Sequence, residues 1–159
     1  MVATLICGQQ RRSGAEVEDR ALRGVSGLMR LGIGEGDIVA IMLRNEMAFV
    51  EAMLAARLAG AYACPINWHF KAAEAGYILQ DCGARVLVVH PTCWRIERGI
   101  PEGTQVIAVE PSAEIRAAYR LEPSQCAAPP NVLEWEQWVA DSPAYDGPAR
   151  PVCPPLPYS

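Results

Sequence analysis

Apolar residues occur in two alternating patterns over the first two thirds of the chain: short continuous runs and positions at helical spacing. Four runs have the length of a strand, 37–43, 62–66, 85–89 and 105–109, and the last two are rich in β-branched residues. Helical spacing follows Ser13, Glu46 and Ala72, where we expect three helices to begin. This alternation predicts an α/β fold, with a mainly parallel sheet covered by helices on both faces.

The first expected helix has clear start and stop signals. Ser13 and Glu16 have the spacing of a capping box, in which the serine oxygen accepts an N–H and the glutamate side chain reaches back. Gly32 follows the last periodic residue and is typical of a helix stop. The preceding residues 4–12 fit a small hairpin that leads into the helix.

The second and third helices are predicted from periodicity alone. Residues 46–58 carry Phe49, Met53 and Ala56 on one apolar stripe. Residues 72–81 direct an apolar face inward, made of Ala75, Ile78 and Leu79. The first segment is followed by Gly60 and the second by Gly83, and an apolar run of strand length comes after each. This is the pattern of helices that connect parallel strands.

Residues 111–159 differ from the rest because they hold ten of the 13 prolines. Proline disfavours long regular elements, so we expect one short helix, around Val132–Val139, in a segment that is mostly loop. The sequence therefore predicts two parts: an α/β subdomain over residues 1–110 and a proline-rich tail over 111–159 that packs on it.

Charge and composition exclude some classes of partner. The formal net charge of -4 offers no basic surface for nucleic acid. Residues 1–12 do not resemble a secretion signal, and the most apolar stretch, 52–66, is interrupted by Arg57 and Pro65 and is too short to cross a membrane. We therefore expect a cytoplasmic protein whose six cysteines are free thiols.

The glycine-rich segment Gly32–Gly36 is a weak candidate for phosphate binding. A dinucleotide-binding loop follows a strand and opens a helix, whereas here a helix precedes the segment and a strand follows it. The order favours a helix stop with a tight turn.

Cysteine and histidine approach one another twice in the sequence, as Cys64 with His69 and as Cys82, His90 and Cys93. Neither group has the paired spacing and four ligands of a zinc site, so we predict no metal site. His69 has no nucleophile or carboxylate spaced to form a triad with it, and we predict no catalytic residue in the chain.

Two tryptophans, Trp135 and Trp138, stand three positions apart in the tail. They could stack a ligand, but packing of an amphipathic helix is the more frequent role of such a pair.

Several segments resemble the acyl-adenylate-forming enzymes, the superfamily that contains acyl-CoA synthetases. Residues 12–17 (RSGAEV) resemble its first core motif, and residues 57–67 (RLAGAYACPIN) resemble the second, Lys-Ala-Gly-x-Ala-Tyr-x-Pro-x-Asp/Asn. Residues 32–43 and 75–89 fall between and after these motifs in the expected order. Asn67 and the following residues are similar to fatty-acyl and related acid–CoA ligases.

The resemblance implies an N-terminal fragment of an acyl-CoA synthetase. Its parent would use ATP, magnesium and CoA on a carboxylic acid, expected to be a fatty acid. Tyr158 and Ser159 match the first residues of the family's phosphate loop, so Ser159 is the one expected cofactor-binding residue. Because that loop and the catalytic lysine would lie beyond the chain, we expect no bound cofactor and no activity from the fragment alone.

The sequence also leaves other functions open besides a ligase fragment. A non-catalytic α/β module that binds a partner is the main alternative to the ligase fragment. A flavodoxin-like binding domain is disfavoured because no strand is followed by a phosphate-cradling loop. Apolar surface that a larger enzyme would cover favours self-association, so a homodimer is also expected.

Overall fold

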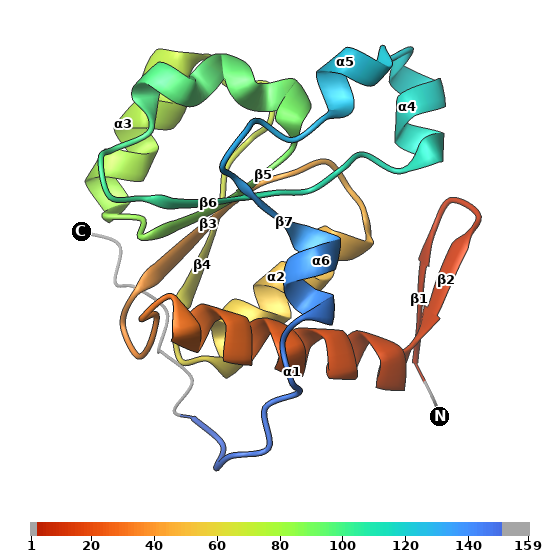
Figure 1. Cartoon of the computed structure of the whole chain (residues 1–159), viewed down its shortest axis with the longest axis vertical. Coiled ribbons are helices and arrows are strands. Elements are labelled where there is room, and N and C mark those ends of the chain that lie inside the picture. The colour runs from red at the N-terminus through yellow and green to blue at the C-terminus, as the bar shows by residue number, and fades with distance from the viewer. Residues whose placement is uncertain (1–2, 151–159) are drawn as a thin grey trace.

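The computed structural model describes residues 3–150 and centres on a parallel sheet with helices on both faces (Figure 1). The sheet strands are β3 (Ile38–Met42), β4 (Tyr62–Pro65), β5 (Val86–Val89), β6 (Gln105–Ala108) and β7 (Leu133–Glu134). Their order is β4-β3-β5-β6-β7, and every neighbouring pair is parallel. The predicted fold class is confirmed.

The helices lie in two layers. They are α1 (Gly14–Arg30), α2 (Met47–Leu58), α3 (Ala72–Cys82), the 3-10 helix η1 (Pro91–Gly99), α4 (Ala113–Tyr119), α5 (Pro123–Cys126) and α6 (Trp135–Ala140). Figure 1 shows α3 on one side of the sheet and α1 and α6 on the other. None of the helices within residues 3–150 combines the length and apolar character that a membrane crossing requires.

Alternate residues of the buried strands pack into two separate hydrophobic cores, one on each face of the sheet. In β3, Val39 and Ile41 pack with α1, α2 and α6, whereas Ala40 and Met42 pack with α3 and η1. All four are essentially inaccessible to solvent. The continuous apolar run that predicted this strand is therefore explained by burial on both faces.

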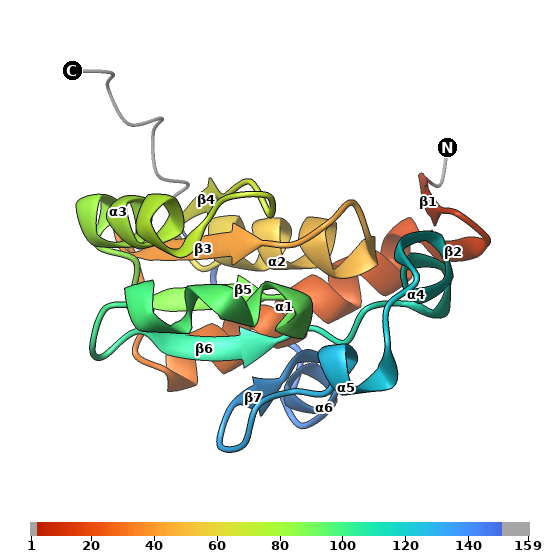
Figure 2. The ribbon, with the colours of Figure 1, turned by 90° about the horizontal axis from the view of Figure 1, so that it is seen from above.

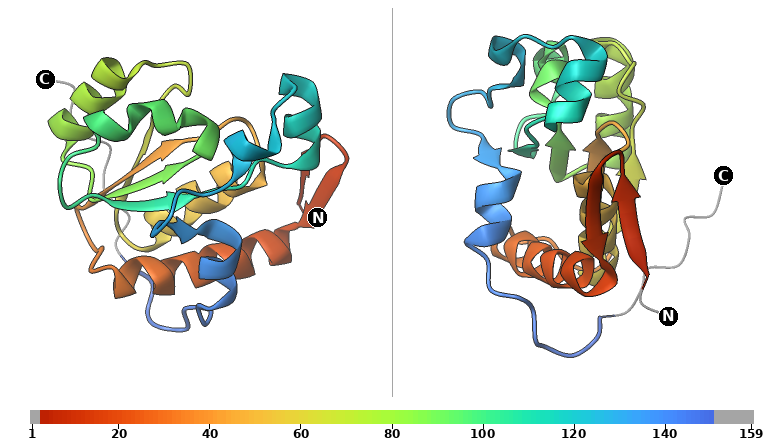
Figure 3. Two further views of the ribbon diagram at one scale, coloured as in Figure 1. Left: turned by 45° about the horizontal axis from the view of Figure 1, so that its top comes forward. Right: turned by 90° about the vertical axis from the view of Figure 1, so that its right-hand side faces the viewer.

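The N-terminal hairpin and the start of α1 agree with the sequence prediction. Strands β1 (Thr4–Cys7) and β2 (Gln10–Ser13) pair antiparallel and lie apart from the main sheet (Figure 3). Ser13 caps α1: its Oγ accepts from the N–H of Glu16, whose carboxylate accepts from the N–H of Ser13 at 2.7 Å. Gly32, with φ +76°, ends the helix.

The buried face of α2 matches the expected stripe only in part, since Ala56 is fully buried but its two predicted companions are not. Met53 is 36% exposed and Phe49 is only partly buried, while the inner face is made of Ala48, Ala52 and other small residues together with one glutamate. Small side chains are needed there because α1 and α2 approach closely. The larger side chains consequently lie on the outer side of the helix.

The tail contains more regular structure than the prolines predicted. Residues 111–150 contribute α4, α5 and α6, and β7 adds a fifth strand to the sheet by pairing with β6. A two-residue strand leaves almost no periodic signal in the sequence. The division at residue 110 stays a prediction, although the segment after it completes the sheet.

The close approach of α1 and α2 gives a first test. A Cβ added at Gly24 would lie 2.7 Å from the Cβ of Ala55, so the substitution Gly24→Ala forces the helices apart. Overpacking costs about 1–3 kcal/mol and outweighs the gain of about 1 kcal/mol in helix propensity. Urea denaturation should therefore show a lower free energy of unfolding for Gly24→Ala.

Ser26→Ala is the matched control, because Ser26 lies on the same helix and loses rather than gains volume. It should stay within about 0.5 kcal/mol of the parent. A Gly24→Ala variant at least as stable as the parent would show that the helices are not in tight contact.

Candidate functional site

The strand order identifies one place where parallel sheets usually bind ligands. From β3 the chain continues to β4 on one side of β3, then crosses to β5 on its other side. Ligands bind outside the carboxyl ends of strands at such a reversal. The carboxyl ends of β3 and β6 point toward α4 and the N-terminal hairpin (Figure 2). The residues that follow β3 and β5 are therefore the first candidates.

Arg44, just after β3, is buried and packs against two aromatic rings that contact each other edge to face. Its guanidinium carbon lies 4.2 Å from the ring centroid of Trp68 and 4.5 Å from that of Tyr119. Its Nη1 donates to Thr92 Oγ1, on η1 after β5, at 2.8 Å. Contacts within about 6 Å of a ring centroid favour a cation. Arg44 thus links the segments after β3, β4 and β5 to α4.

Glu46 and His90 form a second contact at the same edge. His90 follows β5 and is fully buried, and its Nε2 lies 2.5 Å from Oε1 of Glu46, whose side chain is 7% exposed. The other ring nitrogen, Nδ1, lies 3.0 Å from the carbonyl oxygen of Val109, which follows β6. This pair joins the ends of three neighbouring strands.

A hollow of about 360 Å³ lies farther along this edge, between the ends of β6 and β7 and the helices α4 and α5. Its polar lining consists of Glu110, Arg116, Glu134 and Glu136, and Glu110 accepts from Arg116 at 2.7 Å. The volume is at the lower limit for a small-molecule site. Within residues 3–150, no three His, Cys, Asp or Glu side chains are grouped to hold a metal ion.

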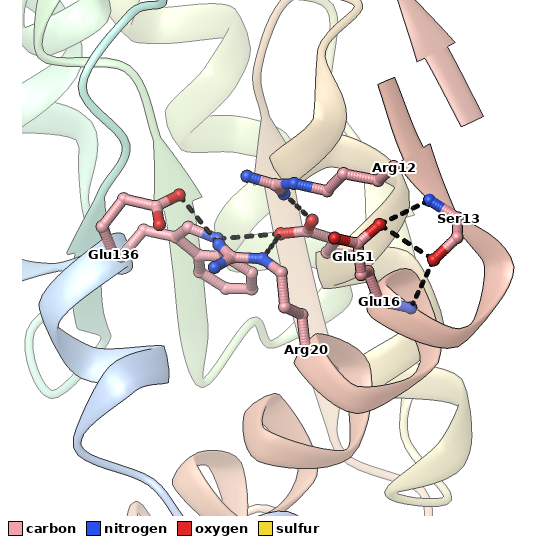
Figure 4. Close-up of polar contacts among 7 residues, drawn as sticks. Arg12, Ser13, Glu16, Arg20, Glu51 and Glu136 are labelled. Carbon is pink, nitrogen blue, oxygen red and sulfur yellow. Dashed lines mark hydrogen bonds and ion pairs between the residues drawn. The ribbon is translucent and has the colours of Figure 1, made fainter. Parts of the chain in front are cut away.

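A buried carboxylate on α2 lies at the contact between α1 and α2 (Figure 4). Glu51 of α2 is fully buried and forms ion pairs with Arg12 of β2 and with Arg20 of α1, the latter at 2.9 Å. Trp135 Nε1 donates to its second oxygen at 3.3 Å. Arg20 also reaches Glu136 on α6 at 2.8 Å.

The Glu51 network is structural in character. An isolated buried carboxylate is costly, but here two guanidinium groups and an indole N–H offset its charge. The desolvation of Arg12 and the nearby charge of Arg20 lower the pKa of the Arg12 guanidinium. Glu51 and its three partners come from four elements, α2, β2, α1 and α6, so the network fixes the tail against α1 and α2.

The weaker sequence candidates have structural roles. Gly32 and Gly36 both have positive φ, +76° and +82°, in the turn between α1 and β3. Trp135 and Trp138 belong to the core below α6, with ring centroids 5.5 Å apart.

His69 is exposed, beside Trp68. Ser159, the expected phosphate-loop residue, lies outside the described residues.

The structure separates the Cys-His groups that the sequence placed near one another. Cys93 is buried and its thiol faces the Trp68 carbonyl oxygen at 3.8 Å, while His90 contacts Glu46. Cys64 on β4 lies instead against Cys82 at the end of α3, and burial together with Cys82 raises the pKa of the Cys64 thiol to about 11. The five cysteines within residues 3–150 are free thiols.

Sequence reasoning missed Arg44, Glu46 and Glu51. The first two carried a usable signal, because polar residues directly after a buried strand lie where parallel sheets bind ligands. Glu51 was visible as the one acidic residue inside the apolar helix Met47–Leu58. What the sequence could not show was its set of partners, which lie up to 84 positions away.

A family model described as "AMP-binding enzyme" matches residues 2–152. The chain is 34% identical over 94 residues to a 2-succinylbenzoate–CoA ligase of Arabidopsis thaliana, covering 58% of this chain and 17% of that protein. It is 33% identical over 114 residues to 4-coumarate–CoA ligase 3 of Oryza sativa, covering 68% and 21%. The chain thus spans about a fifth of the length of these curated relatives.

Solved structures agree on the fold. The anthranilate CoA ligase AuaEII, in complex with anthranoyl-AMP, superposes with a TM-score of 0.77 at 22% sequence identity. The match covers 96% of this chain and 27% of that one. At this identity the similarity concerns the fold, which is that of the N-terminal domain of such ligases.

The Glu51 network generates a second prediction. The substitution Glu51→Gln keeps the shape but leaves Arg12 and Arg20 without their buried counter-charge. It should lower the free energy of unfolding by about 3–5 kcal/mol, measured by urea denaturation. Glu136→Gln, whose side chain is 65% exposed, is the control and should change it by less than about 1 kcal/mol. Equal effects of the two substitutions would contradict the assignment.

The Cys64 thiol gives a third prediction, on alkaline stability. Its pKa is raised from 9.0 to about 11. Above pH 9.0 an unfolded cysteine therefore loses its proton while the folded one keeps it, so stability falls as pH rises from 9.0 to about 11. Cys64→Ala should reduce this fall in denaturation curves, and the raised pKa values of the Cys7 and Cys93 thiols account for part of what remains. A fall of the same size in Cys64→Ala would rule out Cys64 as its cause.

Proposed function

The chain belongs to the AMP-binding enzyme family, and from that premise we propose that it forms the N-terminal part of an AMP-forming acid–CoA ligase. The parent reaction joins ATP and a carboxylic acid to give acyl-adenylate and pyrophosphate, then transfers the acyl group to the CoA thiol. The observation that carries this proposal is the match over residues 2–152, together with relatives that are CoA ligases by name.

The proposed substrate is a carboxylic acid of the fatty acid class. The relatives' names have a carboxylic acid in common. The narrower choice of a fatty acid depends on the resemblance of residues 67–70 to fatty-acyl–CoA ligases. A cytoplasmic location stays a prediction.

We propose that these residues act as a scaffold and do not perform the chemistry. A triphosphate needs several N–H donors and a cation to offset its charge. Residues 3–150 supply no cluster suited to Mg²⁺, and the ends of β3 and β5 are filled by Arg44 and by the Glu46–His90 pair. Binding of ATP by residues within this part of the chain therefore has no visible basis.

The alternative function is a non-catalytic module that binds a partner. One observation favours a docking face: an apolar hollow of about 440 Å³ between the hairpin, α1 and α2. Leu5, Val17, Leu54 and Leu58 contribute to its lining, and Met53 is exposed on the outer side of α2. The expected homodimer would use this face.

A chimera tests the proposal and separates it from the alternative. Residues 2–152 replace the matching segment of the rice 4-coumarate–CoA ligase, and carboxylate-dependent exchange of pyrophosphate into ATP is measured. We expect exchange from the chimera and none from the 159-residue chain alone. The intact rice enzyme is the positive control.

Two outcomes would contradict this account. Exchange by the 159-residue chain alone would show that the scaffold proposal is wrong. A chimera that folds, as judged by circular dichroism and cooperative unfolding, but shows no exchange would favour the partner-binding module.

A further inference from the structure

We propose that Cys64 and Cys82 form a dithiol site that low-molecular-weight disulfides, such as oxidised glutathione, convert to a disulfide bond. Cys64 belongs to β4, the first strand in the order of the sheet, and Cys82 is the last residue of α3. The bond would join this strand to the helix that follows it in the chain. The proposal goes beyond the ligase function proposed above and does not depend on it.

The strand register places the Cys64 side chain on the α3 face of the sheet. In the parallel pair of β3 and β4, Cys64 is paired with Ala40. Paired residues of neighbouring strands point to the same face of a sheet, and successive residues to opposite faces. Ala40 belongs to the core that α3 and η1 cover, whereas Ala63, one residue before Cys64, packs against the core on the other face.

The end of α3 brings Cys82 to the same core. Cys82 is partly buried against the core that contains Ala40 and Leu79, and its Sγ lies 3.7 Å from the carbonyl oxygen of Leu79. The two thiols contact each other there: burial and a hydrogen bond with the Cys82 side chain raise the pKa of the Cys64 thiol to about 11. Two thiols in such contact need only a short approach to reach the S–S bond length of about 2.05 Å.

Within residues 3–150 the other cysteines face groups that are not cysteines. The Sγ of Cys7 donates to the carbonyl oxygen of Asn45 at 3.2 Å, and the Sγ of Cys93 lies 3.8 Å from that of Trp68. Cys126 is buried beside the hollow at α4 and α5. The groups that shift the pKa of the Cys7 and Cys93 thiols include no cysteine. The fold therefore selects Cys64 and Cys82 from the described thiols.

The pair is accessible to a small reagent. Both side chains are only partly buried. Gly83 ends α3 with φ +66°, and a Cβ added there would meet no atom within 4 Å, so the end of the helix beside Cys82 is open. The thiolate is the reactive form of cysteine, and the raised pKa of the Cys64 thiol keeps it protonated at neutral pH. We therefore expect slow oxidation at neutral pH and faster oxidation in mild alkali.

The reaction consists of two successive thiol–disulfide exchanges. In the first, the thiolate of one cysteine attacks a sulfur of oxidised glutathione, which forms a mixed disulfide and releases one glutathione. In the second, the other cysteine attacks the protein sulfur of the mixed disulfide and releases the second glutathione. The two cysteines lose two electrons and two protons, and oxidised glutathione gains them as two molecules of reduced glutathione.

The disulfide would close the segment 64–82, which connects β4 to α3 and contains Trp68. The Trp68 ring packs against the guanidinium group of Arg44 at the carboxyl edge. A cross-link between the ends of a segment restricts the unfolded chain and thereby stabilises the folded one. Oxidation would therefore fix the connection that presents Trp68 to this edge.

Peptide mapping of the 159-residue chain tests the proposal. The folded chain is incubated with oxidised glutathione at about pH 8.5, near the ordinary pKa of cysteine, until the number of free thiols is constant. The remaining thiols are alkylated in urea, and trypsin then separates the two cysteines by cleaving after Lys71. Mass spectrometry should detect peptide 58–71 linked to peptide 72–85, and dithiothreitol should release both.

Three outcomes of the mapping would overturn the proposal. They are alkylated thiols at both Cys64 and Cys82, glutathione adducts that persist on both, and linkage of either one to a different cysteine. Each would show that the two sulfur atoms do not react with each other in the folded chain.

Cys64→Ser and Cys7→Ser are the matched variants. In Cys64→Ser the Cys82 thiol has lost its partner, so it should carry glutathione and form no internal link. Cys7→Ser removes a partly buried thiol outside the pair and should keep the link between peptides 58–71 and 72–85. Loss of that link in folded Cys7→Ser would contradict the assignment.

The stability of the linked chain gives a second readout. Urea denaturation at about pH 7 should yield an unfolding constant roughly 100-fold lower for the oxidised parent than for the reduced parent. The same treatment of Cys64→Ser should leave the unfolding constant unchanged. A linked parent no more stable than the reduced one would show that the fold must distort to form the bond, which would overturn a preformed site.

Discussion

The buried carboxylate of Glu51 is the constraint on which the rest of the structure depends. It is fully buried, and it is compensated by Arg12 from β2, Arg20 from α1 and Trp135 from α6 (Figure 4). A buried charge tolerates few arrangements, because each missing partner leaves an uncompensated group. The network therefore determines how the hairpin, the two long helices and the tail are placed together.

Local signals made much of the fold predictable. Continuous apolar runs identified the four longer strands of the main sheet, and the capping box of Ser13 and Glu16 marked the start of α1. These features depend on residues within one turn or one strand. The resemblance to adenylate-forming enzymes, carried by short motifs in order, was likewise readable without knowledge of distant contacts.

Distant contacts were not predictable. The strand β7 exists because it pairs with β6, and the small residues of α2 face inward because Gly24 allows α1 to come close. Glu46 and His90 stand 44 positions apart in the sequence, and only the order of strands brings them to one edge. Amphipathic periodicity alone therefore placed Ala56 correctly on the buried face of α2 but wrongly buried Met53, which is 36% exposed.

The structure explains why the family's chemistry is proposed to need more than these residues. The carboxyl edge, where parallel sheets usually hold ligands, is occupied by the chain's own Arg44, Glu46 and His90. The hollow of about 360 Å³ lies farther along the same edge, beyond β6. The chain also spans only about a fifth of the length of its curated relatives.

A double-mutant cycle between Glu51 and Arg20 tests the central claim, that a buried charge holds the hairpin, α1, α2 and the tail together. It compares the free energies of unfolding of the parent, Glu51→Gln, Arg20→Met and the double variant. We expect a coupling of about 1–3 kcal/mol, since each single substitution exposes the partner's charge to an apolar surrounding. Additive effects, within about 0.5 kcal/mol, would contradict the claim.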